Sequence, residues 1–230
     1  MTRLLVSVRS GEEANAAVLG GADLIDVKEP NLGALGPASP AVWQEVADRI
    51  PSHMGLSVAA GELVDYDEQT LSEVPSRVSL VKFGLAHCAE RLWHSDLQRM
   101  SQQFSQHCRL VAVIYADAQG CGAPSPIDIV EAAIDLKCGA ILVDTWLKDG
   151  SGLLDHADVA EIGQWFQSAR QAGMMTVVAG SITAATLPDV LLTNPDVVAV
   201  RGAACAGPRE GRVNVDRVSR LKRALQLTCA

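Results

Sequence analysis

Short apolar segments of strand-like composition alternate with helix-like segments along all 230 residues, and this alternation constrains the fold more than any other feature. Eight strands are predicted, at 4–8, 24–30, 56–60, 79–83, 110–116, 140–144, 176–179 and 197–200. Helices are predicted at 11–19, 41–49, 89–106, 126–137, 155–172, 183–192 and 215–227, and the acidic segment 61–77 predicts at most one short helix. Strands and helices that alternate in this way imply a parallel sheet covered by helices.

Two parallel-sheet folds fit this pattern, a closed barrel and an open doubly wound sheet. Eight units in 230 residues match a small α/β fold of the (β/α)8 TIM-barrel type, which we expect to be a single domain spanning residues 1–230. Polar residues recur where the predicted strands end: Arg9, Lys28, Lys82, Asp117, Asp144, Ser181 and Arg201. A doubly wound sheet concentrates its site at one switch point, whereas a barrel collects residues from many strand ends, so this distribution favours the barrel.

Composition and charge exclude several classes of protein. The net charge of −8 and the absence of a basic run argue against nucleic-acid binding. No apolar run reaches the roughly 18 residues of a membrane helix, and the chain begins with a predicted strand rather than a signal peptide. The cysteines (88, 108, 121, 138, 205 and 229) and the histidines lack the spacing of zinc ligands. We therefore expect a cytoplasmic protein with reduced thiols and no metal.

The strand predicted at 24–30 carries charges on one face. Side chains alternate along a strand, so Ile25 and Val27 point to one side and Asp26 and Lys28 to the other. If helices cover the apolar side, a carboxylate and an ammonium lie inside the fold, where unpaired charges cost several kcal/mol each, roughly. A structural ion pair explains such residues, and so does a catalytic lysine with its carboxylate.

Two further strands repeat this arrangement. Lys82 lies between apolar neighbours of the fourth predicted strand, Asp144 ends the sixth, and Lys148 follows four residues later. Burial and a nearby cation lower the pKa of a lysine, and an unprotonated lysine attacks carbonyls to form imines. An imine eases removal of an α-proton or formation of a carbon–carbon bond, while an aspartate or a second lysine moves protons. We therefore predict a site of imine chemistry, with structural salt bridges as the alternative. Asp117, which follows the fifth strand, is a candidate substrate contact.

Small residues follow the last two predicted strands. Gly180 and Ser181 come after the seventh strand, and Arg201, Gly202 and Ala203 come after the eighth. In barrels these loops often bind phosphate through backbone N–H groups and a helix N-terminus. Small residues let the backbone approach the anion, and an arginine offers a fork of donors. We predict that these five residues bind a substrate phosphate, although ordinary turn formation also explains the glycines.

A series of blocks in the chain resembles one known family. The blocks are residues 20–30 (GGADLIDVKEP), 33–36 (GALG), 81–85 (VKFGL), 115–117 (YAD), 144–145 (DT), 148–150 (KDG), 154–156 (LDH), 179–182 (AGSI) and 200–205 (VRGAAC). In this order, and over nearly the whole chain, they resemble the (5-formylfuran-3-yl)methyl phosphate synthases, also called 4-(hydroxymethyl)-2-furancarboxaldehyde phosphate synthases. Segment 61–77 departs from the family pattern.

The resemblance implies a lyase, built as a barrel, that condenses two molecules of glyceraldehyde 3-phosphate. The implied product is a phosphorylated furan aldehyde for methanofuran-type cofactors, released with one phosphate and water. Such family members need no metal or organic cofactor. By position, Lys28 matches the imine-forming (Schiff-base) lysine and Lys82 the proton-accepting lysine, while Asp26, Asp144 and Lys148 match supporting polar residues.

The expected course of the reaction begins with attack of Lys28 on one aldehyde. The enamine then loses phosphate, the remaining skeleton adds to the second aldehyde, and ring closure with dehydration gives the furan. Two alternatives remain open, a class I aldolase-like lyase acting on another sugar phosphate and a non-catalytic barrel that binds a phosphometabolite. In each case the expected partner is a small molecule, with no nucleic acid and no membrane, and a homo-oligomer is left open.

Overall fold

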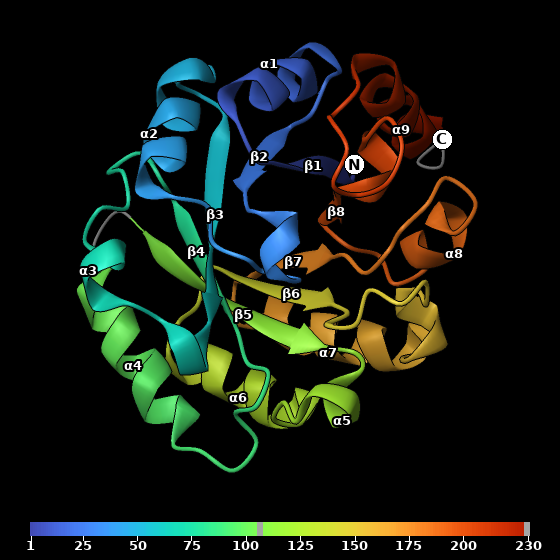
Figure 1. The fold of residues 1–230 in the computed structure, drawn as a ribbon. Helices are drawn as coiled ribbons and strands as arrows, with labels where there is room; N and C mark the ends of the chain where they lie inside the picture. Colours follow the sequence, from blue (N-terminus) through green and yellow to red (C-terminus); the bar gives the residue numbers. More distant parts are fainter. Residues whose placement is uncertain (105–107, 228–230) are drawn as a thin grey trace.

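The eight strands close into a parallel barrel in the computed structural model, which describes residues 1–104 and 108–227 (Figure 1). The strands are β1 (Arg3–Val8), β2 (Leu24–Val27), β3 (Gly55–Glu62), β4 (Leu80–Gly84), β5 (Arg109–Tyr115), β6 (Ala140–Asp144), β7 (Met175–Val178) and β8 (Val197–Val200). Each strand pairs with the next in sequence, and β8 pairs with β1. The predicted (β/α)8 barrel is therefore confirmed, and the open doubly wound sheet is wrong.

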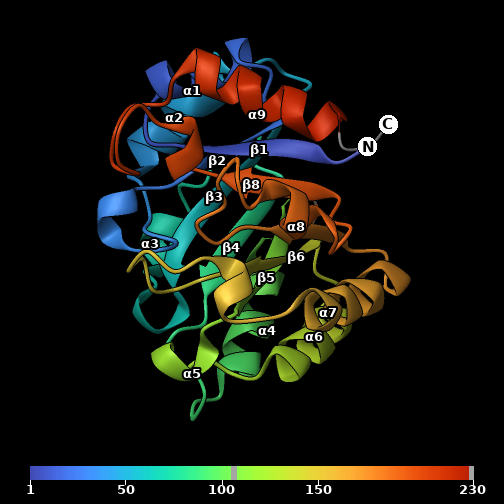
Figure 2. The same cartoon turned by 90° about the vertical axis from the view of Figure 1, so that its right-hand side faces the viewer.

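Helices surround the barrel on its outside (Figures 1 and 2). The longer ones are α1 (Gly11–Leu19), α2 (Pro40–Arg49), α4 (Trp93–Gln103), α6 (Pro126–Asp135), α7 (Val159–Gln171) and α9 (Val215–Leu227). The shorter ones are α3 (Glu68–Leu71), α5 (Ala118–Cys121), α8 (Leu187–Leu191), η1 (Pro30–Leu32), η2 (Leu63–Asp65), η3 (Leu153–Asp155) and η4 (Gly202–Ala204). Within the described residues, no helix has the length and apolar character needed to cross a membrane.

Several helices are shorter than predicted because side chains bind the backbone at their starts. Asp158 and Glu161 form a capping box, which begins α7 at Val159 rather than at residue 155. The hydroxyls of Thr183 and Thr186 accept hydrogen bonds from each other's backbone N–H, and this turn delays α8 to Leu187.

Other elements also differ from the predictions. Helix α4 begins at Trp93, four residues later than expected, and α5 forms where only a loop was expected. The end of the helix predicted at 89–106 lies outside the described residues, as do His107 and Cys229.

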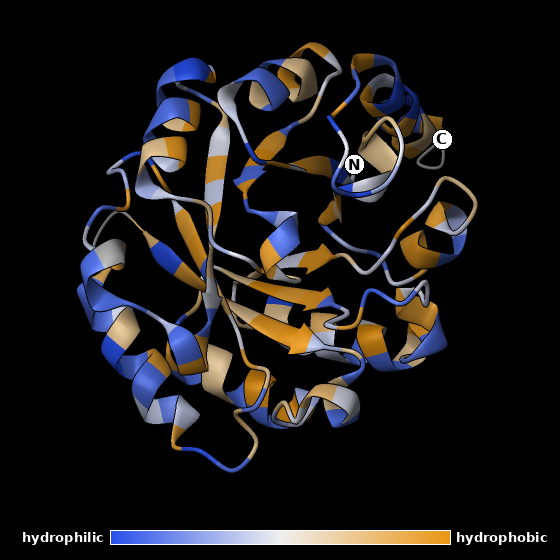
Figure 3. Ribbon diagram, viewed as in Figure 1, coloured by the Kyte–Doolittle hydropathy of each residue, from blue (hydrophilic) through white to orange (hydrophobic). Residues whose placement is uncertain are grey.

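Strand side chains alternate between two apolar layers, as the period of two requires. The outer layer packs between strands and helices and contains Ile25 and Val27 of β2 together with Trp43 of α2. The inner layer fills the barrel and includes Leu24 and Leu142. Figure 3 shows largely apolar strands inside a ring of helices that carry many hydrophilic residues. The inner layer fills the end of the barrel where the strands begin. The opposite end, where the strands finish, is left for polar side chains.

Candidate active site

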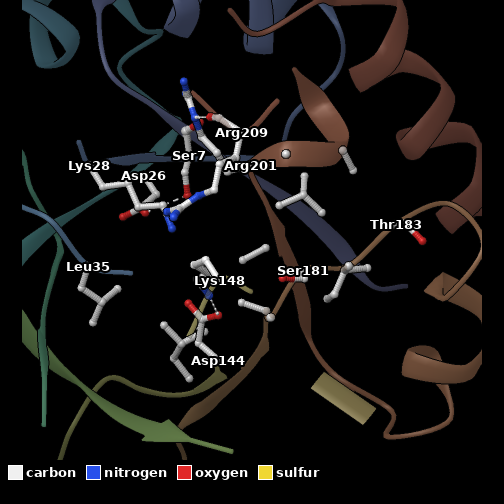
Figure 4. A pocket seen from close by; sticks show the side chains of 18 of the residues that line it. Ser7, Asp26, Lys28, Leu35, Asp144, Lys148, Ser181, Thr183, Arg201 and Arg209 are labelled. Atoms are coloured by element: carbon white, nitrogen blue, oxygen red, sulfur yellow. Dashed lines mark hydrogen bonds and ion pairs between the residues drawn. The ribbon is translucent and has the colours of Figure 1, made fainter. Parts of the chain in front are cut away.

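A cavity of about 250 Å³ lies at the carboxyl ends of the strands (Figure 4). Ten of the predicted site residues line it: Asp26, Lys28, Lys82, Asp144, Lys148, Gly180, Ser181, Arg201, Gly202 and Ala203. They come from loops or strand ends after β2, β4, β6, β7 and β8. Side-chain alternation explains why the strand residues converge, because every second side chain of a barrel strand points to the interior.

Asp26 is the centre of the deepest polar group. Its Oδ1 lies 2.7 Å from the Nζ of Lys82 and accepts a hydrogen bond of 2.7 Å from the Ser57 hydroxyl. Its Oδ2 accepts a bond of 3.0 Å from the Ser7 hydroxyl. Burial alone would raise the pKa of Asp26, but the ammonium groups of Lys82 and Lys28 outweigh burial and lower it. Asp26 is therefore an ionised carboxylate whose two oxygens are already engaged.

Lys28 is the first residue after β2, and its side chain is 8% exposed. Its Nζ donates to the carbonyl of Ala34 at 3.1 Å. Burial lowers the pKa of Lys28 to about 8, although the carboxylates of Asp144 and Asp26 act in the opposite direction. About one tenth of this amine is therefore unprotonated at pH 7, far more than for an ordinary lysine, and the unprotonated form is the carbonyl nucleophile.

Asp144 and Lys148 form the second ion pair of the cavity, at the end of β6. The Nζ of Lys148 lies 3.1 Å from Oδ1 of Asp144 and 3.0 Å from the Thr145 hydroxyl. Burial would raise the pKa of Asp144, but Lys148 and Lys28 outweigh burial and lower it. This pair therefore adds one fixed negative and one fixed positive charge next to Lys28.

The loop after β7 brings two residues of unusual backbone conformation to the cavity. Gly180 and Ser181 both have positive φ values, 100° and 51°. A Cβ on Gly180 would lie 3.1 Å from Leu153 Cβ, so this position is tightly enclosed. These two residues therefore line the cavity with a tightly turned backbone rather than with bulky side chains.

Arg201 lines the cavity, but the structure engages its guanidinium elsewhere. Its Nη1 donates to the carbonyl of Ser7 and to Oε2 of Glu13, and its Nη2 donates to Oε1 of Glu13 at 3.2 Å. The remaining donors bind the carbonyls of Gly211 and Arg209, each at 2.9 Å. A guanidinium has five N–H donors, and all five have protein acceptors here. The expectation that Arg201 offers a free fork to phosphate is therefore corrected, because Glu13 and the backbone saturate it.

Asp117 does not line the cavity. Its Oδ1 and Oδ2 accept hydrogen bonds from the backbone N–H groups of Trp146 and Leu147, at 2.7 and 2.8 Å. Both oxygens therefore hold the loop that carries Lys148, and a contact of Asp117 with substrate stays a prediction.

Several residues of the site were not predicted from the sequence. Ser7 and Ser57 bind Asp26 because they are its direct neighbours in the strand register. The signal was present, because each occupies an inward position of its strand next to a predicted charge. Arg209 lines the cavity from the loop after η4 and had no recognisable signal, since no strand period extends into that loop.

The described residues contain no group of three or more histidine, cysteine, aspartate or glutamate side chains placed to hold a metal ion. The carboxylates nearest the cavity, Asp26 and Asp144, are paired with lysines. Burial raises the pKa of the Cys121 thiol to about 11, so this cysteine of the inner apolar layer is a neutral packing residue.

Solved structures with the same architecture support the fold alone. Phosphoribosyl anthranilate isomerase from Thermotoga maritima superposes with a TM-score of 0.67 at 17% identity, covering 98% of this chain and 99% of that one. The isomerase from Thermus thermophilus gives 0.65 at 14% identity, with the same coverage. These are barrel enzymes too distant in sequence to indicate an activity.

Sequence relatives are much more specific. A family model described as 4-HFC-P synthase matches residues 4–222. The (5-formylfuran-3-yl)methyl phosphate synthase of Methanopyrus kandleri is 34% identical, covering 97% of this chain and 98% of the relative. The enzyme of the same name from Methanothermobacter thermautotrophicus is 33% identical, covering 96% and 98%. The match extends over nearly the full length of both chains and includes every strand that contributes to the cavity, and on this ground the chain belongs to the 4-HFC-P synthase family.

Proposed function

We propose that this enzyme condenses two molecules of glyceraldehyde 3-phosphate into (5-formylfuran-3-yl)methyl phosphate, a furan for methanofuran-type cofactors. The observation that carries the proposal is the buried amine of Lys28, whose pKa is lowered to about 8. Such an amine suits an aldehyde substrate. Three of the cations that line the cavity are paired with carboxylates: Lys82 with Asp26, Lys148 with Asp144, and Arg201 with Glu13. Arg209 and the protonated form of Lys28 remain as positive charge, which suits phosphorylated substrates. The names of the relatives support the product.

The first triose phosphate reacts as an imine. Lys28 attacks its aldehyde carbon, and loss of water gives the imine. Removal of the proton at C2 gives an enamine, and the nitrogen electron pair then expels phosphate from C3. The fragment left on Lys28 is the imine of an enol, in which C3 is nucleophilic.

The carbon skeleton of the product corrects the expected second step. In a (5-formylfuran-3-yl)methyl group the methylene that bears phosphate is a branch, so C3 of the first triose must bond to C2 of the second. Addition to the second aldehyde would give a linear chain and a 2,5-disubstituted furan. The second triose must therefore present its carbonyl at C2, which requires proton transfer from C2 to C1 through an enediol. Its C1 hydroxyl then closes on C2 of the first triose, and loss of two water molecules gives the furan. Hydrolysis of the imine frees Lys28 and the aldehyde, and it uses the water released when the imine formed, so the net loss is two waters.

Proton transfer falls to lysine rather than aspartate in this proposal. Asp26 is ionised and accepts three donors, so it serves as the fixed partner of Lys82. Lys82, 2.7 Å from that carboxylate, is the group we assign to proton transfer at C2. Asp144 and Lys148 set the charge around Lys28. Backbone N–H groups of the Gly180–Ser181 and Gly202–Ala203 turns are proposed to hold a phosphate.

Borohydride trapping tests the first step. Wild-type protein and Lys28→Ala are incubated with glyceraldehyde 3-phosphate and borohydride, and intact mass and peptide maps are recorded. A reduced adduct on Lys28 in wild type, absent from Lys28→Ala, is the expected result. A wild-type protein that binds the triose phosphate but forms no adduct would overturn the imine proposal.

Product analysis separates this proposal from its alternatives. A furan aldehyde absorbs in the near ultraviolet, so the expected reaction gives a new absorbance together with released phosphate. An adduct on Lys28 without that absorbance would indicate an aldolase-like lyase. Binding with neither adduct nor product would indicate a phosphometabolite-binding barrel.

A further inference from the structure

We propose that Arg209 is the cation that binds substrate phosphate, and that Arg201 acts as its positioning residue. The proposal rests on the proposed function, because it assigns the phosphate group of a triose phosphate to this side chain. Arg209 lies in the loop that follows η4 and lines the same cavity as Ser181 and Gly202 (Figure 4).

The backbone of Arg209 is held by the saturated guanidinium of Arg201. The Nε of Arg201 donates to the Arg209 carbonyl, and its Nη2 donates to the Gly211 carbonyl, both at 2.9 Å. The turn between these two residues is closed by Gly211 N–H, which donates to the Pro208 carbonyl at 2.8 Å. Arg201 therefore fixes the chain from which the Arg209 side chain extends, and its own charge is neutralised by Glu13.

The Arg209 guanidinium has donors to spare, unlike Lys82, Lys148 and Arg201, which are paired with carboxylates. Lys82 and Lys148 lie 2.7 and 3.1 Å from their carboxylates. In the part of the chain that the structure describes, the nearest carboxylate contact of Arg209 is to Glu210, at 4.0 Å. Among the described residues, its guanidinium makes one hydrogen bond, from Nη2 to the Gly33 carbonyl at 3.2 Å, and its side chain is 22% exposed. An arginine in this state keeps a pair of N–H groups for bidentate binding of a phosphate.

The position of Arg209 places that phosphate between the turn after β8 and the reactive lysine. A Cβ on Gly202 would lie 3.6 Å from Arg209 Cβ, so the side chain starts beside the Gly202 backbone. On the other side, Arg209 binds the Gly33 carbonyl, and the next carbonyl along, that of Ala34, accepts from Lys28 Nζ at 3.1 Å. One loop thus contacts both the proposed phosphate cation and the proposed nucleophile.

The test compares Arg209→Ala and Arg209→Lys with Arg212→Ala. Arg212 is a matched control on the same loop, because its side chain is 88% exposed and does not line the cavity. Calorimetric titration with inorganic phosphate measures binding independently of the reaction. Borohydride trapping with glyceraldehyde 3-phosphate and with glyceraldehyde, which lacks phosphate, measures the effect on each aldehyde.

Arg209→Ala is expected to weaken phosphate binding about 10- to 100-fold, as loss of a charge-assisted bidentate contact does. The glyceraldehyde 3-phosphate concentration for half-maximal trapping should rise by a similar factor, whereas trapping of glyceraldehyde should change less than about threefold. Arg209→Lys should fall between wild type and Arg209→Ala, and Arg212→Ala should match wild type.

Two results would overturn the proposal. One is wild-type phosphate binding by Arg209→Ala, and the other is an equal loss of trapping with both aldehydes, which would make Arg209 a residue that merely shapes the cavity. A wild-type protein that binds phosphate through Arg209 but forms neither adduct nor furan would leave this assignment standing and remove the proposed function.

Discussion

The Lys28 amine lies among two aspartates and two other lysines, and these charges set the pH at which it can react. Imine formation needs the neutral amine, so the trapping rate should rise with pH and level off above about 8. Asp144 raises the pKa of Lys28 and Lys148 lowers it. Asp144→Asn should therefore move the profile to lower pH, and Lys148→Met should move it to higher pH, each by on the order of one pH unit.

The measurement is the initial rate of adduct formation between pH 6 and pH 10, roughly the range over which a lysine of this pKa titrates. Wild type provides the reference profile. Shifts of the two variants in the same direction would show that the charges of this pair do not control Lys28.

The two buried lysines should affect stability with opposite signs. The pKa of Lys28 is lower in the folded protein than the ordinary lysine value of 10.5. Its charged form therefore costs stability at every pH below about 8, and this cost vanishes above 10.5. Lys28→Met leaves Asp26 with Lys82 and Asp144 with Lys148, and should raise the free energy of unfolding at pH 7 by at most roughly 3 kcal/mol. Lys82→Met removes the ion-pair partner of Asp26 and should lower that free energy by about 3 kcal/mol.

Denaturant unfolding at pH 7 and at pH 10 checks both signs. The gain from Lys28→Met should shrink at the higher pH, because the wild-type amine is then largely neutral. A destabilised Lys28→Met protein would contradict the assignment of Lys28 as a strained group held for reactivity.

The alternation of side chains along a strand explains which site residues could be predicted from the sequence. Asp26, Lys82 and Asp144 alternate with apolar neighbours inside short strands, so their inward direction follows from the strand period alone. The role of Arg201 could not be predicted, because its partner Glu13 lies 188 positions earlier and no local pattern links the two.

At the scale of elements, the loop between β6 and η3 is positioned from the neighbouring strand. Both oxygens of Asp117, which follows β5, hold backbone N–H groups of that loop. Asp117→Ala should free Trp146 and Leu147 and lower the free energy of unfolding by about 2 kcal/mol. It should also displace Lys148 and move the trapping profile to higher pH, in the same direction as Lys148→Met.

Asp117→Asn provides the matched conservative variant. Its single carbonyl oxygen still accepts one of the two N–H groups, so its effects should be smaller in both measurements. A loss of stability with no change in the trapping profile would leave Asp117 a structural residue with no influence on Lys148.

The strands were easier to predict than the helices for a physical reason. Strand interiors are enclosed on both faces and are consequently almost entirely apolar, as in β5 and β6. Helix starts depend on side-chain caps such as those of Asp158 and Thr183, and a capping residue next to another polar residue leaves the boundary ambiguous. The segment 61–77 had no period because it contains only the end of β3, η2 and the short α3.

At the scale of the whole molecule, the barrel closes where the last strand meets the first. Strand β8 pairs with β1, and α9 packs beside α1 (Figure 2). A Cβ on Gly20 would lie 2.5 Å from Val218 Cβ, so the end of α1 and the start of α9 are in close contact. The number of predicted strands indicated a closed barrel of eight. The contacts between β8 and β1 and between α9 and α1 join opposite ends of the chain, so they could not be predicted.

The buried ion pair of Glu13 and Arg201 lies at the junction between β8 and β1. Glu13 lies in the first turn of α1, where the Ser10 hydroxyl caps its N–H at 3.3 Å and its own Oε2 accepts from Arg9 N–H at 3.0 Å. Its carboxylate also neutralises Arg201, which in turn binds the Ser7 carbonyl of β1 at 3.0 Å. The pair thus joins the end of β8 to both β1 and α1.

Glu13→Gln should therefore lower the stability of the whole barrel against unfolding. It leaves a buried guanidinium without its counter-charge, which typically lowers the free energy of unfolding by about 3 kcal/mol. Glu12→Gln is the matched control, because Glu12 is the preceding residue of the same helix and its contact with Arg212, at 3.9 Å, joins two largely exposed side chains. Since Arg201 also holds the Arg209 backbone, Glu13→Gln should raise the triose phosphate concentration for half-maximal trapping, and Glu12→Gln should not. Equal stability of the two variants in denaturant unfolding would mean that the strand pairing between β8 and β1 closes the barrel without this pair.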